Sequence, residues 1–324
     1  MPNSSDSTTS TTNNDDFGED ACYDGCGDTQ GCWSRKRTQD LVYHSCLQSC
    51  NGRVNSLFIS CLEANPTSQT SLLCINQAAY QWLQPFIYHS ISFTTARKLV
   101  LFHRTHDVPD DRLSSRLGWV HNLYIGAGPE QQGDLLYTSP WPLTIVCRLF
   151  WVFTSLERLD LLHLDQNQWQ KLEYAIPSSL KVLTLGPIHG PFHVSDLRKK
   201  PLLEHFTSAE AFMRDDEVLD VVTYPSMKTF RRMTNSTKNG VALCCTDQAE
   251  CVAGSQNLER YEITICAPEP EADEGTEELR TRVKEITDDP RVYISTVPGS
   301  QWNDVIYDEY CSARRQFFGG QQFP

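Results

Sequence analysis

One spacing of apolar residues constrains the fold of this chain more than any other feature. The pattern is L-x-x-L-x-L, with other apolar residues allowed, and it is clearest in the stretch SLKVLTLG, which carries Leu180, Leu183 and Leu185. Six copies begin at Val120, Leu156, Leu180, Leu203, Met227 and Leu258. The steps between them are 36, 24, 23, 24 and 31 residues. A recurring step of this size indicates a chain built from similar units.

The step length is typical of leucine-rich repeats, in which each unit supplies one strand and a helix or a looser return. Such a unit cannot bury its apolar edge alone, so neighbouring units must stack, and their strands form a parallel sheet along one side of an arc. We therefore predict an α/β fold. Its main domain is a short, irregular leucine-rich-repeat arc of parallel strands and helices over residues 116–310.

The segments between the expected strands favour helices. We predict one helix in residues 140–156 and another in residues 213–225, where acidic residues precede a run of valines. In the last unit, Thr276 can cap a helix, and the segment RVYISTV then returns as a strand. A further helix is expected in residues 94–108, ended by Pro109.

The N-terminal third has a different pattern. The first 20 residues are rich in Ser, Thr, Asn and Asp, which cannot bury enough apolar surface to fold. Later stretches have apolar spacings that predict short helices. We divide the chain into a disordered acidic tail (1–20), a Cys-rich segment (21–52), an all-α module (53–95), the repeat domain (116–310) and a C-terminal tail (311–324).

The negative charge of the chain is confined to two segments. The formal net charge is −13 at pH 7; residues 1–34 hold seven acidic and no basic residues, and residues 267–289 hold nine acidic and three basic residues. These segments account for all of it. Since the rest of the chain has no stripe of Lys and Arg to follow a phosphate backbone, we expect no nucleic-acid partner.

Hydropathy and cysteine usage indicate a compartment. The mean hydropathy is −0.42, and no apolar run approaches the roughly 20 residues that a membrane span needs, so we expect no membrane partner. The N-terminus lacks the charged and apolar regions of a secretory signal. We therefore expect a cytoplasmic or nuclear protein whose 13 cysteines are reduced.

Four N-terminal cysteines have spacings that could hold zinc. Cys22 and Cys26 form one close pair, and Cys46 and Cys50 form another. Paired short spacings suit a tetrahedral thiolate site, but the second pair also has the i, i+4 spacing of residues that pack on one helix face. We predict no metal site and no cofactor, and we keep a zinc-stabilised N-terminus as an alternative.

Other chemical motifs are incomplete. The His pairs in HRTHD (103–107) and HGPFH (189–193) lack the Glu of a zinc-protease signature, and GAGPEQQG (126–133) lacks the third Gly of a dinucleotide loop. Asp215, Asp216 and Glu217 lie together, as a catalytic carboxylate pair would, but acidic residues are also typical of a first helical turn. No nucleophile elbow and no Walker loop occur, so we predict no catalytic residues and no enzyme.

Several longer segments resemble a known family. LLCINQAAYQWLQPFIYHSISFTTARKLVLFHRT, SLKVLTLGPIHGPF and PLLEHFTSAEAFMRDDEVLDVVTYPSMKTFRRM are similar to the fungal, chiefly basidiomycete, F-box-like proteins with divergent leucine-rich repeats. The similarity covers residues 53–235. It implies an F-box that binds a Skp-type adaptor, and repeats that select an unknown protein substrate for an SCF-type (cullin-RING) ubiquitin ligase.

The resemblance also assigns adaptor-binding positions. Those that match the family are apolar or aromatic and precede the repeats: Leu57, Ile59, Leu62, Leu72, Leu73, Ile75, Tyr80 and Pro85. Before Leu57 the chain reads NGRVNS, whereas the family opens its F-box with Leu-Pro and an acidic residue. The alternative is therefore a stand-alone repeat binding protein whose F-box has decayed.

The repeat pattern predicts a partner-binding face. If the repeating apolar positions point into the core, the residues between them face outward and line the concave side of the arc. These residues alternate in charge from unit to unit: Glu157, Asp160, Lys181, Thr184, Glu204, Lys228, Arg231, Glu259 and Glu262.

Overall fold

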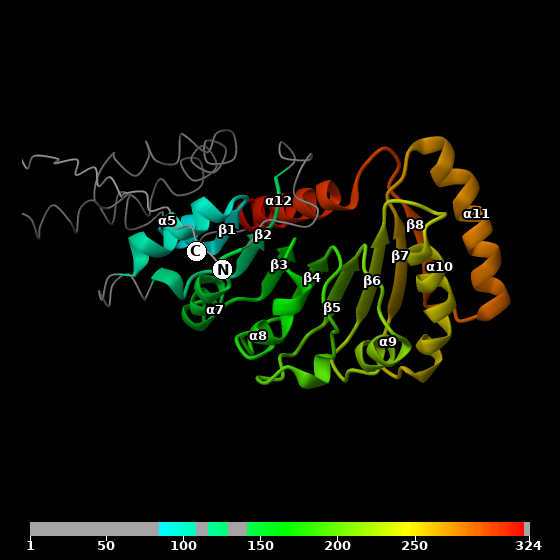
Figure 1. Cartoon of the computed structure of the whole chain (residues 1–324), viewed down its shortest axis with the longest axis horizontal. Helices are drawn as coiled ribbons and strands as arrows, with labels where there is room; N and C mark the ends of the chain where they lie inside the picture. Colours follow the sequence, from blue (N-terminus) through cyan, green and yellow to red (C-terminus); the bar gives the residue numbers. More distant parts are fainter. Residues whose placement is uncertain (1–83, 108–115, 129–140, 321–324) are drawn as a thin grey trace, which may run out of the picture. The chain divides into compact units, whose positions relative to one another are not determined.

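The structure is a computed structural model that describes residues 84–107, 116–128 and 141–320 (Figure 1). Its centre is an eight-stranded sheet in which every strand is parallel to its neighbours and the spatial order is the chain order. The strands are β1 (Ser90–Phe93), β2 (Asn122–Ile125), β3 (Arg158–Leu162), β4 (Val182–Gly186), β5 (His205–Ala209), β6 (Thr229–Thr234), β7 (Arg260–Ile265) and β8 (Val292–Thr296). The predicted α/β class with parallel strands is confirmed.

The repeating apolar positions set the register of the sheet. Leu159 pairs with Leu183, Leu183 with Phe206, and Phe206 with Phe230. All of these side chains are buried, and the rings of Phe206 and Phe230 stack with centroids 5.4 Å apart. The side chain at one matched position of each strand enters the same core, so the spacing of apolar residues in the sequence determines which residues pair between strands. The six predicted copies lie at β2 to β7.

Helices cover both faces of the sheet, in unequal measure. The connecting helices pack on one face through the main apolar core (Figure 1): α5 (Ala96–His106), α7 (Leu143–Val152), α8 (Trp169–Glu173), α9 (Asp215–Val222), α10 (Gly240–Asp247) and α11 (Glu269–Ile286). Short 3₁₀ turns complete the connections at Gln166–Gln168, Val194–Asp196 and Gln248–Gly254. On the opposite face, which we call the open face, lies α12 (Trp302–Gly320).

Local signals explain where several helices begin. Thr95 accepts a hydrogen bond from the Lys98 backbone N–H at 3.2 Å and so caps α5, and Asn239 caps α10 by accepting from Ala242 at 2.8 Å. The predicted helices in residues 94–108, 140–156 and 213–225 are confirmed as α5, α7 and α9.

The N-terminal limit of the sheet differs from the prediction. Strand β1 lies within the expected all-α module, and it pairs with β2 in the same parallel register as the later strands. The sequence SISF has only two apolar residues, Ile91 and Phe93, which is too short a stretch to show the repeat spacing. Residues 53–83, which hold the rest of the predicted F-box-like module, lie outside the described residues.

Two elements near the C-terminus also differ. The helix expected to begin at Thr276 begins at Glu269, and Thr276 is buried within it. Pro270 sits in its first turn, where the missing N–H is not needed. The predicted tail from residue 311 continues α12 as far as Gly320. Among the described residues, no helix is both long and apolar enough to cross a membrane.

Candidate interaction surfaces

The nine residues of the predicted partner-binding face form two rows that cross the strands. The first, which we call the entry row, stands just before the strands: Glu157, Lys181, Glu204, Lys228 and Glu259. The second, which we call the strand row, stands within the strands at matched register and contains four predicted residues: Asp160, Thr184, Arg231 and Glu262. Ser92, Tyr124, Thr207 and Tyr293 stand at the same register on β1, β2, β5 and β8.

The entry row is a ladder of alternating charge on a continuous backbone. Each row residue from Lys181 onward donates its backbone N–H to the carbonyl of the row residue before it, always at 2.8 Å. Lys181 Nζ lies 3.2 Å from Glu157 Oε1, and Lys228 Nζ lies 2.6 Å from Glu204 Oε2. The hydrogen bond from Lys228 lowers the pKa of the Glu204 carboxyl, which stays ionised. The row therefore presents ordered, solvent-accessible charges of both signs.

The strand row is not the open surface that the sequence predicts. Asp160 and Thr184 are buried, so the expectation that they face solvent is wrong. The reason is α12, whose Trp302, Ile306 and Tyr310 are buried in an apolar cluster on the open face. That cluster includes residues from β2, β3, β5 and β6: Tyr124, Leu162, Ala209 and Met233.

Charges on the covered part of the strand row are paired within the chain. Arg158 Nε lies 2.8 Å from Asp160 Oδ2, which supplies the buried carboxylate with a counter-charge. Arg231 binds Glu309 of α12 with both guanidinium nitrogens, at 2.6 and 2.7 Å. The side chain of Arg231 is 17% exposed. This pair links α12 to β6.

The end of the strand row on β7 and β8 is polar and more accessible. Arg260 lies 3.0 Å from Glu262 and 4.8 Å from the ring centroid of Tyr293, which is 47% exposed. Ser295 donates to Glu262 at 2.7 Å. The side chain of Glu262 is 16% exposed, so it is partly buried between Arg260 and Ser295 and not the open surface residue that the sequence predicts.

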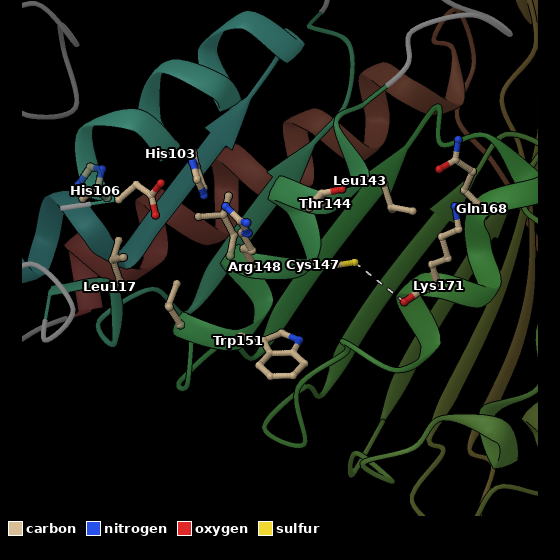
Figure 2. Close-up of a pocket in the computed structure, with 13 residues that line it drawn as sticks. His103, His106, Leu117, Leu143, Thr144, Cys147, Arg148, Trp151, Gln168 and Lys171 are labelled. Atoms are coloured by element: carbon tan, nitrogen blue, oxygen red, sulfur yellow. Dashed lines mark hydrogen bonds between the residues drawn. The ribbon is translucent and has the colours of Figure 1, made fainter. Parts of the chain in front are cut away.

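A groove that the sequence did not reveal lies on the other side of the sheet, where α5, α7 and α8 meet (Figure 2). Its volume is about 690 Å³, and its apolar lining includes Leu117, Leu143, Leu149 and Val152. Trp151 stands at its edge with its ring pointing away from the α7 backbone. In the sequence, Trp151 falls off the face formed by Val146, Leu149, Phe150 and Phe153, which are buried, and that mismatch was the available signal.

One histidine of each pair noted in the sequence, His106 and His189, is engaged in the fold. His106 donates from Nδ1 to the Phe102 carbonyl at 2.7 Å, and its Nε2 lies 2.9 Å from the Tyr88 hydroxyl. His189, in the second His pair, contacts the Gly190 carbonyl and the Ser208 hydroxyl, and burial lowers its pKa to about 4. Within the ranges described, no cluster of His, Cys, Asp and Glu could hold a metal ion. The cysteine pairs of the zinc alternative lie outside those ranges.

The acidic triplet at the start of α9 has a structural role. Glu217 is buried, and its carboxylate accepts from the backbone N–H groups of Arg214 and Phe192, both at 2.6 Å. Asp216 is exposed and pairs with Arg214 at 2.6 Å. The contact with the Arg214 N–H caps the start of α9. The Phe192 N–H belongs to the connection after β4, so Glu217 links two successive repeats.

Most residues assigned to adaptor binding, from Leu57 to Tyr80, lie outside the described residues. Pro85 is described; it is partly buried in a helix that precedes β1. Comparison of the chain with family models, with curated proteins and with solved structures gave no match. The surfaces themselves therefore carry the functional argument.

Proposed function

We propose that this chain is a protein-interaction scaffold of the F-box-like type, in which a leucine-rich-repeat-like arc selects a protein substrate for an SCF-type ubiquitin ligase. In this proposal the module before the sheet binds a Skp-type adaptor, and the repeat domain binds the substrate. The chain acts by recruitment and performs no chemistry of its own. It works in the cytoplasm or the nucleus.

The observation that carries this proposal is the entry row. Repeated units in register place one charged side chain per strand at the same edge of the sheet, from Glu157 to Glu259. A regular array of this kind offers extended polar contacts to a protein surface, which is how stacked repeats bind partners. The row of alternating charges favours a partner with a complementary sequence of charges.

Adaptor binding is tested by pull-down of the purified full chain with a Skp-type adaptor. We expect the wild-type chain to retain the adaptor at micromolar concentrations, and the double variant Leu72→Asp/Leu73→Asp to lose it. The control is Leu202→Asp, which makes one such change at a leucine that is 70% exposed on the repeat domain. If the wild-type chain retains no adaptor, the ligase role is refuted and only the scaffold role is left.

A second function is favoured by the position of β1. Because the sheet already includes Ser90–Phe93, the last residues of the segment assigned to the F-box-like module (53–95) belong to the repeat domain. The second candidate is a stand-alone repeat binding protein with a decayed F-box and a zinc-stabilised N-terminus. Metal analysis of the full chain decides this point: one zinc ion per chain, lost in Cys22→Ser/Cys26→Ser, together with no adaptor binding, supports it.

A further inference from the structure

The most exposed aromatic ring on the helix-covered side of the sheet belongs to Trp151, among the residues that the structure describes. It is 69% exposed, although it sits in an apolar helix whose other face is buried against the main core. Val152, next to it, is also exposed. Tryptophan is among the residues most enriched at the energetic centres of protein interfaces, so an exposed ring beside an apolar hollow indicates a binding surface.

The hollow beside Trp151 can take a side chain. The groove between α5, α7 and α8 has a volume of about 690 Å³, and leucines from several elements form its walls. Figure 2 shows Arg148 and Lys171 along the same groove, from α7 and α8. An apolar group that entered would leave water while charged groups stayed at the rim, which is the usual anatomy of a protein interface.

The rim of this groove is basic, in contrast to the acidic chain. Arg148 and Lys171 line it, and Lys199 Nζ lies 5.8 Å from the centroid of the Trp151 ring. Asp107 is the one acidic residue among the lining side chains. Within the described part of the chain, Arg148, Lys171 and Lys199 form no ion pair, whereas Lys181, Lys228 and Arg231 are each paired. Three unpaired cations around an exposed tryptophan favour an anionic partner.

We propose that this groove binds an acidic segment of a partner protein, which inserts an aromatic or aliphatic side chain beside Trp151 and places carboxylates next to Arg148, Lys171 and Lys199. The inference rests on the proposed function as an interaction scaffold, and it names the chemistry of the partner. A segment of protein is favoured over an anionic bilayer because the apolar walls are recessed, where a side chain fits and a bilayer surface does not.

The test is selection of a random peptide library, displayed on phage, against the immobilised full chain. We expect enriched peptides to carry Asp or Glu on either side of an aromatic or aliphatic residue. A fluorescein-labelled copy of the strongest peptide then gives a dissociation constant by fluorescence anisotropy. Its binding should weaken as salt rises, because the carboxylate contacts are exposed.

Matched variants locate the site. Trp151→Ala should weaken binding about tenfold or more, and Arg148→Glu/Lys171→Glu should weaken it by a similar factor. The controls are Tyr174→Ala, which removes an aromatic ring that is 59% exposed just after α8 and outside the groove, and Lys238→Glu, at an exposed cation on the loop before α10. Both controls should bind like wild type, and all variants should keep the thermal midpoint of the wild-type chain, since each site is exposed.

Three outcomes overturn the proposal. The first is a selection that enriches no peptides combining acidic residues with an aromatic or aliphatic one. The second is an enriched set of peptides whose affinity for the chain is unchanged by Trp151→Ala and by the charge reversals. The third is sedimentation with phosphatidylserine vesicles that exceeds peptide binding and is lost in Trp151→Ala, which would assign the groove to a membrane surface. Adaptor pull-down with the same Trp151→Ala protein separates the two proposals, because adaptor binding should be unaffected by this change.

Discussion

The pair between Arg231 and Glu309 gives a direct test of how α12 covers the open face. Glu309→Gln removes the counter-charge of a guanidinium whose side chain is only 17% exposed and that makes two hydrogen bonds, at 2.6 and 2.7 Å. Breaking a fully buried ion pair costs about 3–5 kcal/mol, and a hydrogen bond to a charged group contributes about 1.5–3 kcal/mol. Because the side chain of Glu309 is 36% exposed, we expect Glu309→Gln to lower the free energy of unfolding by the smaller amount, about 1.5–3 kcal/mol.

The measurement is urea unfolding of four proteins: wild type, Glu309→Gln, Arg231→Met and the double variant. A double-mutant cycle should give a coupling free energy of about 1–3 kcal/mol. The double variant should therefore be more stable than the sum of the two single-variant losses in unfolding free energy predicts. The control is Glu277→Gln, which breaks the exposed pair with Arg280, where Glu277 is 72% accessible, and should cost no more than about 0.5 kcal/mol. A coupling below about 0.5 kcal/mol between Arg231 and Glu309 would refute the placement of α12 across the strands.

Three further results are expected. Leu183→Ala should lower the free energy of unfolding by about 2–5 kcal/mol, because Leu183 is fully buried in the main core, whereas Lys181→Glu, at an exposed site, should cost no more than about 0.5 kcal/mol; urea unfolding distinguishes them. Glu217→Ala should cost about 1–3 kcal/mol because two backbone N–H groups lose their acceptor, while Asp216→Asn should leave the unfolding midpoint within error. The pKa of His189 is about 4 in the fold and about 6.5 in the unfolded chain, so the unfolded state binds more protons; stability should be complete above pH 6.5 and fall as pH drops toward 4, and His189→Gln should flatten this part of the stability profile.

Side-chain periodicity was enough to predict most of the sheet. A leucine or aromatic at each repeated position can be buried only if the strands align, so the spacing from Val120 to Ile263 predicted β2 to β7 and their order. Strand β1 was missed because two apolar residues carry no period. The start of α9 could also be predicted from the sequence, because acidic residues are typical of a first helical turn.

The surfaces were harder to predict because they depend on contacts between distant parts of the chain. Nothing near Asp160 in the sequence indicates that Tyr310 and its neighbours cover that part of the sheet. The groove beside Trp151 likewise requires three helices that are brought together by folding. Alternation along a strand gives the side on which a residue stands, and it cannot give what else packs there.

The covering of the open face by α12 has a consequence for synthesis of this protein on the ribosome. Stacked units contact mainly their neighbours in the chain, so they can assemble one after another as they leave the exit tunnel. Tyr124 of β2 nevertheless lies 5.4 Å, between ring centroids, from Tyr310, which is made 186 residues later. Until that helix emerges, the apolar side chains Tyr124, Leu162 and Met233 stay in contact with water. A nascent chain stalled before residue 302 therefore presents a nearly complete sheet with an exposed apolar face. This is the form of the protein that chaperones would retain most strongly.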